Sequence, residues 1–140
     1  TGVYDIGETA RRALEADFWA DWCSEEETMA CIRRTFETKG YLLDTHTAVA
    51  AGVYEKYKKT GDATKTVIVS TASPYKFPQD VLASLGESTE GMDAFALSRR
   101  LSEKTGTRLP RQIEELETKP VRHKTVVERS GMREAVLEAL

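Results

Sequence analysis

The sequence predicts an α/β fold that is rich in helix, with two short parallel strands at about 41–44 and 66–70. Two observations lead to this prediction. Apolar residues recur at helical spacing through most of the chain. Near its middle, Val67, Ile68 and Val69 form an unbroken run of β-branched residues without a charge. Such a run suits a strand buried on both faces, as in a three-layer α/β/α domain.

Length and composition limit the classes of function. The 140 residues are enough for a single domain, predicted here as 1–140. Lys and Arg number 20 against 23 Asp and Glu, and this balance argues against a broad nucleic-acid interface. No apolar run approaches the roughly 18 residues of a membrane span, so no membrane contact is expected.

The cysteine pattern predicts no metal site. Cys23 and Cys31 are the only cysteines, and they stand eight residues apart without a second pair. A zinc site needs closer paired ligands together with further Cys or His side chains. Two small thiols in a reducing cytoplasm are the simplest interpretation, so the expected location is cytoplasmic.

Two capping-box spacings predict the first two helices. The pair Asp5 and Glu8 precedes a helix at about 6–17. Its expected packing stripe consists of Ala10, Leu14 and Phe18. The pair Ser24 and Glu27 precedes a second helix that runs to about Thr38. Gly40 is well placed to end that helix in a left-handed cap.

Asp44 follows the first predicted strand and is a good N-cap for a helix from 45 to about 59. The first half of this helix is almost entirely small residues. Gly52 within it costs up to about 1 kcal/mol relative to alanine. We therefore expect a close neighbour at that position.

Further helices are predicted in the last half of the chain. Their limits are Pro78 to Gly86, Asp93 to Gly106, Pro110 to Leu116, and a terminal helix from a capping box at Thr125 and Glu128 to about Ala139. The terminal helix is expected to pack through Val127, Val136, Leu137 and Leu140.

The hydroxyl residues after Val69 are the first place to look for chemistry. Ligands in open α/β sheets bind beyond the carboxyl ends of parallel strands. A triad of Ser70, His46 and Asp44 is disfavoured, because Asp44 and His46 are only two residues apart and the serine lacks flanking glycines. Lys76 could act as an amine nucleophile, but a salt-bridging or substrate-facing role is favoured. No glycine-rich phosphate loop is present.

Two segments resemble one enzyme family. Gly40-Tyr-Leu-Leu-Asp-Thr-His-Thr-Ala-Val-Ala50 resembles the G-Y-x-x-D-P-H-T-A-V segment of threonine synthase, and Ser70-Thr-Ala-Ser-Pro-Tyr-Lys-Phe-Pro78 resembles its T-A-H-P-A-K-F-P segment. Similarity extends to the segment at Ser24 and to the tail at Leu109-Pro110 and Lys119 to His123. It covers most of the chain but only the carboxyl-terminal third of such an enzyme.

This resemblance implies the carboxyl-terminal part of a pyridoxal phosphate enzyme of fold type II. Such an enzyme converts O-phosphohomoserine and water to L-threonine and phosphate. Its Schiff-base lysine and phosphate loop lie earlier in the sequence, in an amino-terminal part that would be the partner of this segment. No residue of this chain is therefore expected to hold the cofactor covalently. The segment by itself is expected to be inactive and not to bind pyridoxal phosphate.

The resemblance also implies residue roles. Thr71 would approach the pyridine nitrogen of the cofactor. The other residues expected to line or support the pocket are His46, Thr47, Ser70, Ser73 and Lys76. Lys76 could face a phosphate or carboxylate of the substrate, a small phosphorylated amino acid. Three positions depart from the family pattern: Thr45 replaces proline, Ser73 replaces histidine, and Tyr75 replaces a small residue that would leave a wider pocket.

A function of a different class stays open at this point. His46 is equally compatible with a purely structural role. The small residues of the helix at 45–53 would also suit a protein-docking face. The alternative is therefore a stand-alone helical α/β interaction module without catalysis.

Overall fold

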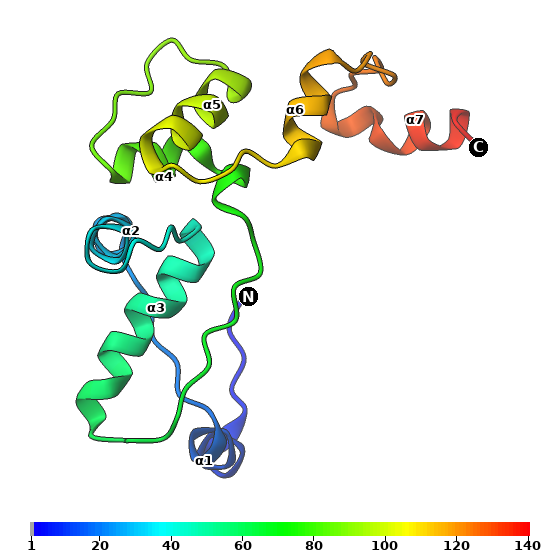
Figure 1. Ribbon diagram of the computed structural model, residues 1–140. Helices are drawn as coiled ribbons and strands as arrows, with labels where there is room; N and C mark the ends of the chain where they lie inside the picture. Colours follow the sequence, from blue (N-terminus) through cyan, green and yellow to red (C-terminus); the bar gives the residue numbers. More distant parts are fainter. Residues whose placement is uncertain (1) are drawn as a thin grey trace. The chain divides into compact units, whose positions relative to one another are not determined.

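The computed structural model describes residues 2–140, which form two units. The first unit ends at Pro110 and the second is Arg111–Leu140. The described residues contain helices and connecting segments, and no strand forms among them (Figure 1). None of these helices is both long enough and apolar enough to cross a membrane. The helix-rich character predicted from the sequence is confirmed.

Helix α1 (Gly7–Asp17) differs from its prediction in how it starts and what it buries. Asp5 accepts a hydrogen bond from the Gly7 N–H at 2.8 Å, but Ile6 is the N-cap and the expected capping box is not formed. Gly7 has a φ of +73°, and this turn leaves Asp5 outside the capping position. Leu14 and Phe18 are 50% and 70% exposed, so the expected packing stripe is not buried.

Helix α2 (Glu25–Lys39) begins and ends as its sequence predicts. The Ser24 hydroxyl accepts a hydrogen bond from the Glu27 N–H at 3.2 Å, and the Glu27 carboxylate accepts one from the Ser24 N–H at 2.9 Å. Gly40 has a φ of +64° and donates its N–H to the Phe36 carbonyl. The predicted capping box and left-handed cap are both confirmed.

Helix α3 (Thr45–Tyr57) packs against α2, and a short 3-10 turn, η1 (Lys58–Thr60), follows it (Figure 1). Asp44 is the N-cap, as expected. Ala48 is fully buried. A Cβ atom added to Gly52 would lie 2.7 Å from the Cys23 sulfur, so the predicted close neighbour of this glycine is Cys23.

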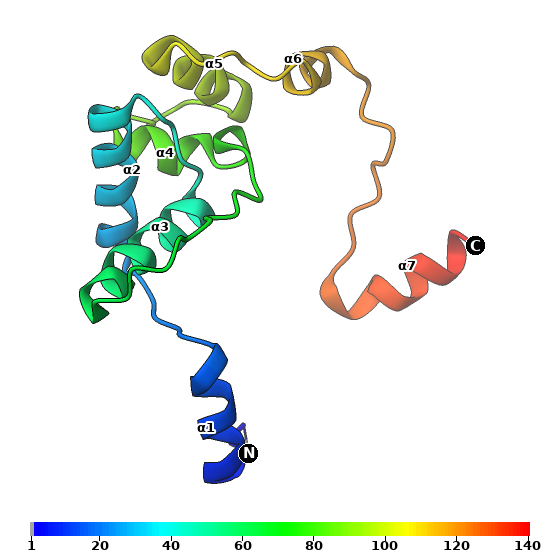
Figure 2. The same cartoon turned by 60° about the horizontal axis from the view of Figure 1, so that its bottom comes forward.

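The two predicted strands do not form. Leu42 and Leu43 are buried, but Val67 and Val69 are 85% and 70% exposed. A strand needs the backbone groups of a neighbouring strand, and the described residues provide none. Segment 66–70 instead runs back along α3 as irregular chain (Figure 2). Within the described residues, therefore, neither the predicted strand buried on both faces nor a three-layer domain is formed.

Two further helices, α4 (Pro78–Ser84) and α5 (Ala94–Thr105), complete the first unit. Asp93 caps α5 by accepting a hydrogen bond from the Ala96 N–H at 2.8 Å, and Gly106 ends it with a φ of +67°. Arg33 of α2 donates its Nε–H to the Ser84 carbonyl at 2.7 Å and so ties α2 to α4. The buried apolar residues of the unit are Cys31, Ile32, Leu42, Leu43, Ala48, Tyr75, Val81, Leu82, Leu97 and Leu101.

The second unit contains α6 (Arg111–Thr118), a 3-10 turn, η3 (Arg129–Gly131), and α7 (Met132–Glu138). The capping box expected at Thr125 is not formed, and the terminal helix starts only at Met132. Gly131 disfavours helix, and seven residues gain little from helix propagation alone. The residues expected to pack this helix are exposed: Val127, Val136, Leu137 and Leu140.

Candidate functional site

A polar cluster joins the start of α3 to segment 66–70. The Asp44 carboxylate accepts hydrogen bonds from the His46 N–H at 2.9 Å and the Thr47 N–H at 3.2 Å, both at Oδ1. Its Oδ2 accepts a short hydrogen bond from the Thr47 hydroxyl. Thr47 Oγ1 also lies 3.1 Å from the Ser70 hydroxyl oxygen. This contact links Ser70 to the start of α3, 23 positions earlier in the chain.

The direction of hydrogen bonding in this cluster follows from the number of protons. A carboxylate only accepts, and a threonine hydroxyl has one proton to donate. The Thr47 proton is used by Asp44, so the Ser70 hydroxyl donates to Thr47. The chain of donors runs from Ser70 through Thr47 to a charged acceptor, which is the arrangement that strengthens such bonds.

Exposure along segment 66–70 alternates. Val67 and Val69 are 85% and 70% exposed, whereas Ile68 between them is 37% exposed. Ile68 and Ser70 line a cavity of about 510 Å³ together with Thr47 of α3. Val67 and Val69 line a second cavity beside α3, together with Ala50, Val53, Tyr54 and Tyr57, but they leave more of their surface exposed than Ile68 does.

The residues that follow Ser70 have separate surroundings. Thr71 is exposed. Ser73 accepts a hydrogen bond from the Tyr75 N–H at 3.3 Å and caps the 3-10 turn η2 (Pro74–Lys76). Lys76 is exposed, with its ammonium 5.9 Å from the centre of the Phe77 ring. The structure thus places Ser73 in a local structural role.

Tyr75 does not narrow a pocket beside Thr71, contrary to the expectation from the sequence. Its ring is buried, with 7% of the residue exposed. Its hydroxyl lies 2.9 Å from the Thr107 carbonyl, to which it donates, and 2.8 Å from the Thr107 hydroxyl. The side chain has turned into the core because an aromatic ring gains more from burial there.

His46 lies apart from the Thr47–Ser70 pair. Its ring packs 5.1 Å from the Phe77 ring, and 63% of its side chain is exposed. It lines a different cavity, of about 360 Å³, that also borders Asp80. Of the residues predicted for the pocket, the structure brings Thr47 and Ser70 together. The His46 ring packs on Phe77, while its Nδ1 stays 3.6 Å from Asp44 Oδ1.

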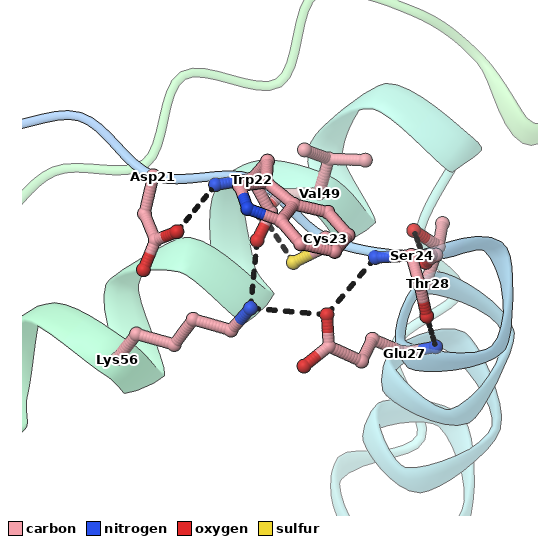
Figure 3. Close-up of polar contacts among 8 residues, drawn as sticks. All are labelled: Asp21, Trp22, Cys23, Ser24, Glu27, Thr28, Val49 and Lys56. Carbon is pink, nitrogen blue, oxygen red and sulfur yellow. Dashed lines mark hydrogen bonds and ion pairs between the residues drawn. The ribbon is translucent and has the colours of Figure 1, made fainter.

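A second polar cluster fastens the chain before α2 to the side of α3 (Figure 3). The Lys56 ammonium donates to the Trp22 carbonyl at 2.7 Å and to Glu27 Oε2 at 3.0 Å. The Ser24 N–H, and after it Lys56, holds the pKa of the Glu27 carboxyl below its usual range. This cluster positions Cys23 against Gly52.

The Cys23 thiol is a packing group. It lies 3.7 Å from the Val49 carbonyl, to which it donates. Burial raises the pKa of this thiol, an effect that outweighs the opposing charge of Lys56. A thiol held in its protonated form is a poor nucleophile and a poor metal ligand.

Sequence reasoning predicted Asp44 as a helix cap and disfavoured it as the acid of a triad with His46 and Ser70. The structure shows that it also organises the hydroxyls of Thr47 and Ser70. The D-x-x-T spacing is a signal for the first link, because a cap carboxylate and the residue three positions later are neighbours. The link to Ser70 carries no such local signal.

Comparison with known protein families identifies the chain. The family model described as Threonine synthase, C-terminal, matches residues 47–137, well over half of the chain. The chain belongs to this family. The match starts at Thr47 and includes segment 66–70, Thr71 and the whole of α4 to α6.

Individual relatives agree with this assignment. The chain is 41% identical over 83 residues to human threonine synthase-like 1, a match that covers 59% of this chain and 11% of that protein. The protein of the same name from Macaca fascicularis is 42% identical over 83 residues, with the same coverage. Threonine synthase from Schizosaccharomyces pombe is 34% identical over 88 residues, which covers 61% of this chain and 16% of that protein. The matched region is a small part of each relative.

Proposed function

We propose that this chain is the carboxyl-terminal part of a pyridoxal phosphate-dependent enzyme that converts O-phosphohomoserine and water to L-threonine and phosphate. Membership of the threonine synthase family is the observation that carries the proposal. The similarity to a relative named threonine synthase supports this reaction in particular. Since the matched region is 11% to 16% of the relatives, the activity belongs to a longer protein.

Thr71 is our candidate for the residue that contacts the cofactor. It is exposed and follows a serine that is anchored to α3. A neutral hydroxyl beside the pyridine nitrogen leaves that nitrogen largely unprotonated. Bound pyridoxal phosphate would supply the electron sink for the chemistry, and Thr71 would moderate it. Lys76, also exposed and five residues further on, is a candidate for contacting an anionic group of the substrate.

The rest of the pocket would come from the amino-terminal part of the same enzyme. Val67 and Val69 expose most of their apolar surface, and burying them would be favourable by about 1.5–3 kcal/mol each. Backbone groups of segment 66–70 are not used in a strand pair within the described residues. Strand pairing by the amino-terminal part would satisfy both needs, and would make the three-layer fold type II domain expected from the sequence.

Thr71 would supply one side of a pyridoxal site, and the amino-terminal part of the enzyme would supply the phosphate cradle. A phosphate cradle needs clustered backbone N–H groups, usually in a glycine-rich loop. The nine glycines of this chain are scattered. We therefore expect this segment alone to be inactive and to bind no pyridoxal phosphate.

The alternative function, a stand-alone interaction module, finds less support. It relied on the small-residue face of the helix at 45–53 as a docking surface. Ala48 on this helix is already fully buried, and Cys23 already covers Gly52. These two small residues serve packing within the chain.

The proposal is tested in the longer protein that carries this segment. We expect a bound pyridoxal chromophore and phosphate release from O-phosphohomoserine. Thr71→Val should lower kcat about ten- to a hundredfold, the range for losing one hydrogen bond to a cofactor. The far-ultraviolet circular dichroism should stay unchanged.

Thr66→Val is the matched control. It makes the same replacement in the same segment, and its hydroxyl lies 3.2 Å from the Thr64 carbonyl, a purely local partner. Its activity should equal that of the wild type. A wild-type protein with no chromophore and no phosphate release would disprove the proposed function, and full activity in Thr71→Val would remove Thr71 from the site.

A further inference from the structure

Ser70 is the point at which segment 66–70 is fixed to α3 by a side-chain hydrogen bond. Its hydroxyl lies 3.1 Å from that of Thr47, which is 4% exposed. Thr47 is itself held by Asp44, which is 1% exposed. The anchor therefore ends on a buried carboxylate whose two oxygens both accept hydrogen bonds.

The contact between Ser70 and Thr47 also bears on the side to which Thr71 points. Since side chains of an extended segment alternate, fixing Ser70 toward α3 directs Thr71 away from α3. A shift of one residue would reverse every side chain of the segment. Thr71 would then face α3, and Ser70 would lose its contact with Thr47.

Apolar contacts alone specify this register poorly. Val67, Ile68 and Val69 are all β-branched and apolar, so either face of the run could lie against α3. Ser70 differs because its hydroxyl meets a specific partner. A hydrogen bond to one defined partner discriminates between the two registers, whereas packing of similar side chains does not.

We propose that Ser70, held by Asp44 through Thr47, is a positioning residue that fixes the register of segment 66–71 and so the side on which Thr71 lies. The position of Thr71 toward a cofactor rests on the proposed function. The register itself does not, because the three residues and the segment are all in this chain.

The register is tested by nuclear magnetic resonance on the 140-residue chain. In the wild type, we expect nuclear Overhauser effects between the Ser70 β-protons and the Thr47 methyl group. The ¹⁵N order parameters of residues 68–71 should be near the rigid value of about 0.85. In Ser70→Ala, those effects should vanish and the order parameters should fall below about 0.6. Asp44 and Thr47 stay paired in this variant, so the helix start is preserved.

Two further variants distinguish the loss of the Ser70–Thr47 hydrogen bond from a general disruption of the segment. Thr66→Ala removes a hydroxyl whose bond, to the Thr64 carbonyl, is local, and should leave residues 68–71 rigid. Ser70→Thr keeps the hydroxyl and should restore rigidity. Unchanged order parameters and contacts in Ser70→Ala would overturn the proposal, as would an equal loss in Thr66→Ala.

The consequence for Thr71 is tested in the longer protein by cofactor binding. Ser70→Ala should weaken pyridoxal phosphate about tenfold and shift its absorption in the same direction as Thr71→Val. If the order parameters of residues 68–71 fall in Ser70→Ala but its pyridoxal phosphate affinity and absorption stay unchanged, Ser70 does not position Thr71. A wild-type protein that binds no pyridoxal phosphate would refute the proposed function instead, and the resonance experiment would still decide the register.

Discussion

Gly52 of α3 and Cys23 of the preceding segment are in direct contact: a Cβ atom on residue 52 would lie 2.7 Å from the Cys23 sulfur. This separation is shorter than any ordinary contact between carbon and sulfur. The glycine is therefore required by a neighbour 29 residues earlier, and its cost to the helix is offset by the packing that it permits.

Gly52→Ala should destabilise the chain despite the better helix propensity of alanine. Overpacking typically costs about 1–3 kcal/mol, against a propensity gain of at most about 1 kcal/mol. In a Cys23→Ala background the clash is gone, and the same change should be neutral or stabilising. Urea denaturation of the wild type, Gly52→Ala, Cys23→Ala and the double variant measures the coupling free energy between the two residues. An equal effect of Gly52→Ala in both backgrounds would contradict the contact.

Asp44→Ala should cost more stability than Asp93→Ala, although both residues are aspartate N-caps. Asp93 accepts one hydrogen bond, from the Ala96 N–H, and its loss should cost about 1 kcal/mol. Asp44 also accepts from the Thr47 hydroxyl and is buried, so its loss should cost about 3 kcal/mol.

Asn is as good an N-cap as Asp, so Asp44→Asn tests the capping role separately. It should lose much less stability than Asp44→Ala in the same urea experiment. Equal losses for Asp44→Ala and Asp93→Ala would mean that the Thr47 hydrogen bond contributes nothing.

The turn after α3 should give the chain an acid-sensitive element. Hydrogen bonds from Thr64 and from the Tyr57 hydroxyl lower the pKa of Asp62 from 3.8 to about 2. A carboxyl with a lowered pKa stabilises the fold fully above its ordinary value. This contribution is lost as the pH falls from about 3.8 through 2.

Carbon-detected titration of Asp62 measures this pKa directly. Tyr57→Phe should raise it toward 3.8, because one of its donors is removed. In Asp62→Asn, the loss of stability between pH 4 and pH 2 should be smaller than in the wild type. A pKa of 3.8 for Asp62 in the wild type would show that the hydrogen bonds from Thr64 and Tyr57 do not form.

Much of the helical structure could be predicted from local sequence. The caps at Ser24, Asp44 and Asp93 and the left-handed glycines at Gly40 and Gly106 all occur as expected. These features involve residues within about four positions of one another, so the sequence contains both partners. The misplaced helix starts at Asp5 and Thr125 show the limit, since Gly7 and Gly131 each alter the chain near the cap.

The candidate site was predicted in part. Its hydroxyl residues could be located from the resemblance and from their place after an apolar run. Their grouping could not, because the pairing of Thr47 with Ser70 and the packing of the His46 ring on Phe77 are tertiary facts.

Segment 66–70 shows why sequence and structure contribute different things. Its composition determined that it is apolar, β-branched and followed by hydroxyls, and local motifs determined the family resemblance. Its burial could not be determined this way, because a strand is buried on both faces only within a sheet, and no neighbouring strand forms among the described residues. Only the tertiary structure showed that Ser70 faces α3, since a hydrogen bond between residues 23 positions apart depends on how the chain folds back.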